Sequence, residues 1–335
     1  MQRLGPRRSH PRSLARGEHD GASGSHDSIS TRISYDSSVE DFTYNEFAYF
    51  HENLAEWDLD VEVPPVRRFF VAVDGLRQVS GLAWGEGAAE LVLVHGGAQN
   101  AHTFDTVALA LGRPLLALDL PGHGHSDPGP HGSSSARTHA TDLERALEQL
   151  LDRPVPLVGM SLGGLTSLFI AHERPDLVSE LVLVDITPGV NADKARHITD
   201  FVNGPATFAD FDELLARTIE HNPTRSVSSL RRGILHNALR RDDGTWVWRH
   251  QQHPAPAEAA PPQGDLWRVL EEITVPVTLI RATWASSVVD DEDEARFLQA
   301  RPGARVVRVE AGHSVQGDNP LALAALLADR GRGVH

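Results

Sequence analysis

Ser161 stands in the stretch LVGMSLGG, with Gly159 two residues before it and Gly163 two residues after it. The run that precedes it, PVPLVGM, has the apolar character of a strand, and the residues that follow have helical spacing. A serine on such a tight strand–turn–helix connection projects above the sheet, where the helix N-terminus favours a developing negative charge. Glycines are required on both sides because side chains there would collide with neighbouring backbone. The pattern predicts that Ser161 is a nucleophile.

A serine nucleophile needs a base, and His313 is the predicted one. The chain has 18 histidines, but His313 directly follows the apolar run ARVVRVE and the dipeptide Ala311-Gly312. A loop after that strand can return the imidazole to Ser161, and the serine precedes the histidine in the order expected for this turn. We therefore expect His313 to act as the general base.

A glycine-rich turn follows another strand-like run, ELVLV, and has the sequence His95-Gly96-Gly97-Ala98. Exposed backbone N–H groups in such a turn can bind an oxyanion. The N–H of Gly97 and that of Leu162, the residue after the nucleophile, are the two predicted donors. The same glycines also suit a tight strand-to-helix turn, and the two roles are compatible.

The elements that must position these residues alternate between strand-like and helical runs. Continuous apolar runs suit strands that are buried on both faces of a parallel sheet. They are preceded by a predicted hairpin, RFFVAV and RQVSGLAW, which turns at Asp74-Gly75. The alternation predicts an α/β fold with a doubly wound, mostly parallel sheet. The strand-like runs lie at 90–95, 114–120, 154–160, 180–186, 275–280 and 304–310, with helical spacing at 140–151 and 161–175.

Composition changes along the chain suggest three parts. Residues 1–40 mix Arg, Ser, Gly and His without apolar periodicity, and we expect them to be disordered or poorly ordered. The core is predicted over 41–186 and 273–331. The interval 187–272 contains amphipathic pieces and no strand-like run, so we expect a helical cap over the carboxyl ends of the strands.

The bulk properties exclude several classes of protein. A formal net charge of −15 disfavours a nucleic-acid partner, because phosphates repel such a surface. No apolar run approaches the roughly 20 residues that a membrane helix needs. The absence of cysteine excludes disulfides, thiolate chemistry and Cys-ligated zinc, and it fits a cytoplasmic protein. The histidines lack paired carboxylates at ligand spacing, so we expect neither a metal nor a cofactor.

Taken together, four motifs resemble those of the α/β-hydrolase superfamily: HGG, DLPGHGHSD, GMSLGG and AGHSVQGDNP. The similarity covers roughly residues 68 to 331. The resemblance implies an eight-stranded, mostly parallel sheet flanked by helices, a Ser-His-acid triad and an inserted helical cap. Members near this chain resemble esterases, lactonases, cofactor-independent haloperoxidases and C–C bond hydrolases.

The resemblance leaves the triad acid open. In most of the family the acid follows the seventh strand, where this sequence has LIRATWASSVVDDEDEARF and aligns Ser286 with the expected aspartate. Asp290 and Asp291 come next, but they fit the acidic first turn of a helix. Some branches resemble this chain in placing an aspartate, here Asp185, after the sixth strand. We expect Asp185 to accept the imidazole N–H, with Asp290 and Asp291 as alternatives.

The expected reaction is acyl transfer to Ser161, with hydrolysis of a small-molecule ester, thioester or lactone through an acyl-enzyme. The alternatives are a cofactor-free haloperoxidase or C–C bond hydrolase, and a non-catalytic, ligand-binding member of the fold. We expect Phe104, Trp284, Trp246 and Trp248 to line the substrate pocket. The partner is a small molecule, and the oligomeric state stays open.

Overall fold

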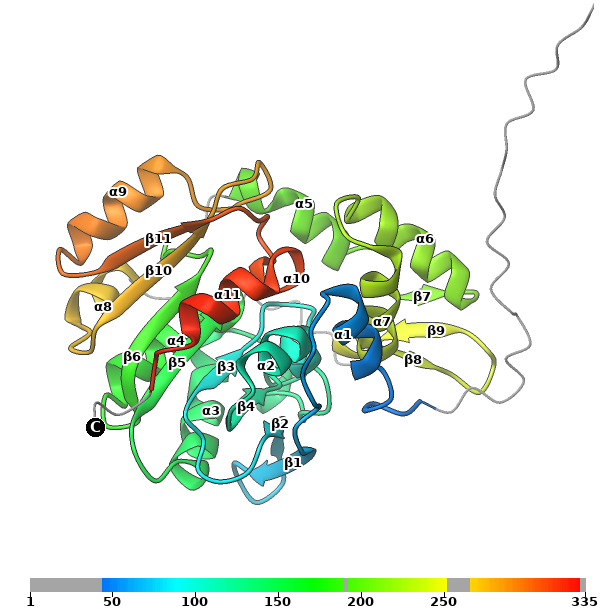
Figure 1. Cartoon of the computed structure of the whole chain (residues 1–335), viewed down its shortest axis with the longest axis horizontal. Helices are drawn as coiled ribbons and strands as arrows, with labels where there is room; N and C mark the ends of the chain where they lie inside the picture. The colour runs from blue at the N-terminus through cyan, green and yellow to red at the C-terminus, as the bar shows by residue number, and fades with distance from the viewer. Residues whose placement is uncertain (1–43, 190–191, 252–265, 332–335) are drawn as a thin grey trace, which may run out of the picture. The chain divides into compact units, whose positions relative to one another are not determined.

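The computed structural model describes residues 44–189, 192–251 and 266–331, so the segment 1–40 lies outside the described residues. The strands of the main sheet are β1 Val66–Ala72, β2 Gln78–Trp84, β3 Val92–Val94, β4 Leu115–Leu118, β5 Val155–Met160, β6 Val178–Val184, β10 Val277–Ala282 and β11 Arg305–Val309. They form one eight-stranded sheet in the order β1-β2-β4-β3-β5-β6-β10-β11 (Figure 1). The strand β2 pairs antiparallel with β1 and β4, and all other pairs of this sheet are parallel. The mostly parallel α/β sheet expected from the sequence is confirmed.

Helices cover both faces of this sheet, and each face has its own apolar core. The α-helices of the main body are α1 Phe50–Glu56, α2 Asp105–Leu111, α3 Ala136–Leu150, α4 Leu162–Glu173, α8 Leu266–Glu272, α9 Asp291–Ala300, α10 Val315–Asp318 and α11 Pro320–Leu327. Leu168 of α4 belongs to one core and Leu323 of α11 to the other. Val92 and Leu93, adjacent on β3, point into different cores. Burial of each such side chain stabilises the folded state by roughly 1.5–3 kcal/mol.

Between β6 and α8 the chain leaves the sheet and forms what we call the insertion, the described residues 192–251. Its elements are α5 Ala192–Val202, β7 Thr207–Phe208, α6 Phe211–His221, α7 Val227–Asn237, β8 Ala238–Arg240, β9 Trp246–Trp248 and the 3₁₀ turn η3 Arg249–Gln251. The expectation that this interval has no strand is wrong, because β7, β9 and β8 form a small antiparallel sheet. Strands of two or three residues are too short for alternation to show in a sequence.

The helix α8 lies within the interval 187–272 in which the sequence predicted a cap. It packs against α4 and α9 of the main body, and Leu270 is fully buried in their common core. In the described part of the chain, no helix is long and apolar enough to cross a membrane.

The helix α1, which precedes the first strand, contacts both the main body and the insertion. Phe50 is 5% exposed and belongs to the same apolar core as α2. Glu52 pairs with Arg231 of α7 at 3.2 Å, and Glu56 pairs with Arg232 of the same helix. The described residues before the first strand therefore pack on the main body.

Candidate active site

Ser161 lies on the turn between β5 and α4, where its backbone has φ 51° and ψ −120°. Such a conformation costs roughly 1–3 kcal/mol for a residue with a side chain, so the surrounding structure must hold it in place. A Cβ atom on Gly159 would lie 2.5 Å from the carbonyl oxygen of Gly163, and one on Gly163 would overlap the carbonyl oxygen of His95. The prediction that both flanking glycines are sterically required is confirmed.

The turn after β3 is fixed by the fully buried His95. Its Nε2 accepts the N–H of Leu120 at 3.0 Å, so its Nδ1 carries the proton and donates to the Gly96 carbonyl at 2.7 Å. Burial lowers the pKa of His95 to about 3, which keeps the ring neutral, as this bonding requires. Gly97 and Leu162 are neighbours, because a Cβ on Gly97 would lie 3.7 Å from Leu162 Cδ2. Leu162 is the first residue of α4, so its N–H has no partner within the helix.

Asp185 follows β6 with φ 48° and is fully buried. Its Oδ2 lies 2.9 Å from Nδ1 of His313. Because a carboxylate can only accept, Nδ1 carries the proton and Nε2 of the neutral ring is left as an acceptor. The structure thus brings together the predicted base and the favoured acid.

Three further donors hold the Asp185 carboxylate. The Ala282 N–H bonds Oδ1 at 2.9 Å, and the Val288 N–H bonds Oδ2 at 3.1 Å. The Ser287 hydroxyl donates to Oδ1 at 2.6 Å. The end of β10 and the loop after it therefore supply hydrogen-bond donors to an acid on a neighbouring strand.

The two alternative acids are engaged elsewhere. Asp290 caps α9 by accepting the N–H groups of its first turn, and its carboxylate also pairs with Lys194. The hydrogen bond from Lys194 and the cap bonds lower the pKa of Asp290 to about 2. Asp291 is 92% exposed and pairs with Arg281 at 2.7 Å. Both carboxylates serve the start of α9, as the acidic-turn interpretation expects.

Ser161 and His313 line one cavity of about 820 Å³, and so do Gly97 and Leu162. Residues of the insertion, including Trp248, form another part of the cavity wall. The four groups that acyl transfer requires, the nucleophile, its base and two backbone donors, therefore lie on residues that line a single cavity.

Of the four aromatic residues expected in the pocket, the structure places Trp248 in the cavity wall and the other three outside it. Phe104 is fully buried in the core that α2 shares with α11. Trp246 packs edge-on against Phe211 within the insertion, with ring centroids 5.2 Å apart. Trp284 is 40% exposed on the surface.

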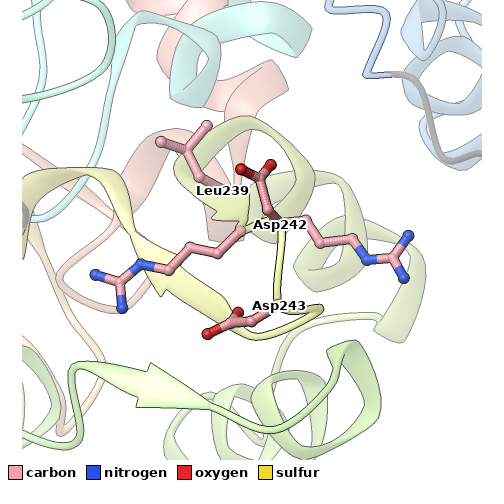
Figure 2. Close-up of a pocket in the computed structure, with 5 residues that line it drawn as sticks. Leu239, Asp242 and Asp243 are labelled. Atoms are coloured by element: carbon pink, nitrogen blue, oxygen red, sulfur yellow. The ribbon is translucent and has the colours of Figure 1, made fainter.

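A second hollow of about 660 Å³ lies at the turn between β8 and β9 (Figure 2). Its wall consists of residues 239–243 of a single hairpin, and the carboxylates of Asp242 and Asp243 point away from each other (Figure 2). No nucleophile or histidine lines this hollow. We therefore place the candidate active site in the larger cavity.

A buried charge cluster in the cavity wall was not found from the sequence. His102, Asp105 and His236 bring their ligand-type atoms within 4.8 Å of one another, a set that could hold a metal ion. However, His102 Nδ1 lies 2.9 Å from Asp105 Oδ2, and its Nε2 lies 3.5 Å from Glu46. Burial alone would lower the pKa of His102, but the two carboxylates raise it to about 9. A protonated imidazole has no free lone pair, so we interpret the cluster as a charge network.

Comparisons with known proteins identify the fold to which this site belongs. A family model described as the alpha/beta hydrolase fold matches residues 90–320. The esterase Rv0045c of Mycobacterium tuberculosis is 39% identical over 290 residues, which cover 83% of this chain and 93% of the esterase. A crystal structure of that esterase superposes with a TM-score of 0.73 at 38% identity, and covers 86% of this chain and 98% of its own. A 2-(acetamidomethylene)succinate hydrolase of Mesorhizobium japonicum is 28% identical over 246 residues, which cover 70% of this chain and 85% of that enzyme.

Proposed function

The chain belongs to the α/β-hydrolase fold family, and from this premise we propose that it is a serine esterase that cleaves a small-molecule ester through an acyl-enzyme on Ser161. The observation that carries the proposal is that Ser161 and the His313–Asp185 pair converge on one cavity. An esterase that is 39% identical over most of its length favours esters over the thioesters, lactones and C–C bonds that the sequence left open.

Acylation begins when the Ser161 hydroxyl attacks the ester carbonyl carbon while His313 Nε2 accepts its proton. Asp185 holds the Nδ1–H tautomer of the imidazole and stabilises the imidazolium that forms. His313 then gives the proton to the leaving alcohol. General-base catalysis of this kind contributes about 10²- to 10⁴-fold to the rate.

Backbone donors stabilise the charge that develops on the carbonyl oxygen. The N–H groups of Gly97 and Leu162 bind this oxyanion, and the N-terminal end of α4 adds a favourable field. Removing one donor of an oxyanion hole typically costs about 10²- to 10³-fold in turnover. A water molecule, activated in turn by His313, then attacks the acyl-enzyme and releases the acid.

The insertion acts as a cap that shapes the substrate pocket, since its residues form one wall of the cavity. The substrate is a small molecule, because the cavity of about 820 Å³ is within the usual size range of small-ligand sites. The cytoplasmic location expected from the sequence stays a proposal.

A fluorophosphonate probe tests the nucleophile directly. Wild-type protein should be labelled on Ser161 and should hydrolyse short p-nitrophenyl esters, and Ser161→Ala should lose both properties while keeping its circular dichroism spectrum. A folded wild-type protein that is neither labelled nor active on any ester would refute the proposal and favour the non-catalytic, ligand-binding alternative. Activity on ring-cleavage diketones without ester hydrolysis would favour a C–C bond hydrolase instead.

A further inference from the structure

Besides the protonated His102, three cationic side chains line the cavity: Lys194, Arg225 and Arg232. Lys194 pairs with two carboxylates at the start of α9, and Arg232 pairs with two carboxylates of α1. In contrast, no carboxylate of the described residues lies within the 4.0 Å ion-pair distance of Arg225. Arg225 is therefore the one cation in the described cavity wall whose charge the protein leaves without a direct counterion.

The hydrogen bonds of the Arg225 guanidinium are incomplete as well. Nη2 donates to the Ser229 hydroxyl at 2.6 Å. Nε is shielded from solvent and has no acceptor among the described residues. Since a guanidinium carries five N–H donors, most of its bonding capacity is left for a ligand or for water.

Arg225 packs against the short helix that follows the proposed catalytic base. A Cβ atom on Gly317 would lie 2.8 Å from the Arg225 Cζ, so the guanidinium packs directly against the backbone of Gly317. Gly317 belongs to α10, which begins two residues after His313. The unpaired cation is thus adjacent to the short helix that follows the base, in the same cavity as Ser161.

An unpaired cation that is partly buried is costly, and burial lowers the pKa of Arg225, consistent with this cost. A ligand that carries a negative charge removes the cost when it binds. Building on the proposed esterase function, we propose that Arg225 is an anion subsite and that the natural ester substrate carries a carboxylate that binds its guanidinium.

The surroundings of Arg225 favour a singly charged group. The Asp318 carboxylate, whose Oδ2 accepts the Gly312 N–H at 3.0 Å, is near enough for the two charges to interact, although they form no ion pair. Asp318 repels any anion, but it repels a doubly charged phosphoryl group more strongly than a carboxylate, which matches the planar guanidinium with one charge. The substrate class is therefore a half-ester or another ester acid.

Matched ester pairs test the subsite in the acyl part and in the leaving group. The first pair is p-nitrophenyl hydrogen glutarate and its neutral methyl ester; the second is 4-acetoxybenzoate and methyl 4-acetoxybenzoate. Wild-type enzyme should prefer the acid in at least one pair. Arg225→Met should lower kcat/KM for that acid about 10- to 100-fold, the size expected for a charged hydrogen bond, and change the neutral ester less than about threefold.

Arg217→Met is the matched control, because Arg217 lies on α6, outside the cavity wall, and its removal changes the net charge equally. It should leave the preference for the acid unchanged. If neutral esters are hydrolysed but no pair shows a preference that depends on Arg225, the subsite is refuted and the esterase function stands. If neither acid nor neutral ester is cleaved and Ser161 is not labelled, the proposed function fails first.

A binding measurement separates recognition from turnover. Calorimetry with monomethyl glutarate should show binding to Ser161→Ala and at least tenfold weaker binding to Ser161→Ala/Arg225→Met. Equal affinity of the two folded variants would also refute the subsite.

Discussion

The ends of β6 and β10 both place aspartates near the candidate site, and the structure uses them in opposite ways. At the end of β6, Asp185 is fully buried and accepts three hydrogen bonds from the β10 side as well as one from His313. After β10, Asp290 and Asp291 are half to almost fully exposed and pair with basic side chains. Carboxylates of the same chemical type thus differ in burial and in the donors around them.

This difference shows how the end of β6 can supply the triad acid in place of the loop after β10. Where most of the family has the acid, the β10 loop carries serines, and Ser287 donates to Asp185. The loop therefore still contributes to the same hydrogen-bond system, as a donor that orients the carboxylate instead of the carboxylate itself.

Of the substitutions that test this difference between β6 and β10, Asp185→Asn should reduce activity most. The carboxamide cannot both accept the surrounding N–H groups and accept the imidazole N–H of His313, so the histidine loses its productive tautomer. We expect kcat to fall about 10³- to 10⁴-fold, as for the equivalent change in a serine protease triad. Steady-state hydrolysis of p-nitrophenyl acetate measures the effect, and a thermal melt verifies folding. Full activity of Asp185→Asn would show that the triad acid is not at the end of β6.

Moving the acid to the β10 loop should partly reverse that loss. Ser286 Oγ lies close to Gly312, the residue before His313, so a carboxylate at this position is near the imidazole. Asp185→Asn/Ser286→Asp should recover about 10- to 100-fold of the activity of Asp185→Asn, the size of one charged hydrogen bond. Ser286→Asp alone is the control and should not exceed wild-type activity. A double variant no faster than Asp185→Asn would show that the β10 loop no longer supports an acid.

Ser287→Ala tests the donor role of the β10 loop. It removes one hydroxyl bond to Asp185 and leaves the carboxylate in place. The expected loss is about 1 kcal/mol of orienting interaction, or roughly fivefold in kcat. Thr should restore most of the activity at this position. A loss as large as that of Asp185→Asn would mean that Ser287 has a direct role in the reaction.

Asp290→Ala should leave kcat unchanged and reduce stability. Asp290 forms a capping box with Asp293 at the start of α9. Loss of such a cap costs about 1 kcal/mol, measurable as a shift in the urea midpoint. Asp291→Ala removes an exposed carboxylate from the same turn without removing the cap, and should cost less. A large loss of activity in Asp290→Ala would revive Asp290 as the acid.

The smallest expected effect is the pH dependence of this cap. The pKa of Asp290 in the folded protein is about 2, below its ordinary value of 3.8. A lowered folded-state pKa contributes stability above the unfolded value, and the contribution is lost as the pH falls through the folded value. The difference in unfolding midpoint between wild type and Asp290→Ala should therefore narrow as the pH falls from about 4 towards 2. A difference that stays constant over this range would mean that the carboxylate charge has no part in the cap.

The sequence alone predicted those elements whose structure is determined by a pattern of neighbouring residues. The strands of the main sheet were predictable because continuous apolar runs mark buried parallel strands. The turn at Ser161 was predictable because its glycines and flanking elements are neighbours in the chain. Strands β7, β8 and β9 were missed because they are too short to show a period.

The rest depends on contacts between segments distant in the sequence. The bonds that Ser287 and Val288 give to Asp185 depend on β6 and β10 being adjacent in the sheet. Whether Arg225 has a counterion depends on how the insertion lies against α10. The wrong placement of three of the four aromatic pocket residues has the same cause. The sequence pattern around an aromatic residue can indicate whether its side chain is buried, but not which element it packs against.

The ion pairs between α1 and α7 have a kinetic consequence. The insertion is held to the main body by several contacts, and the ion pairs that Glu52 and Glu56 of α1 make with α7 add to those between Lys194 and α9. Any outward movement of the insertion from the main body must break these ion pairs. Because these bonds are ionic, the release rate of products should rise with ionic strength, and the segment before the first strand becomes a determinant of turnover without touching the substrate.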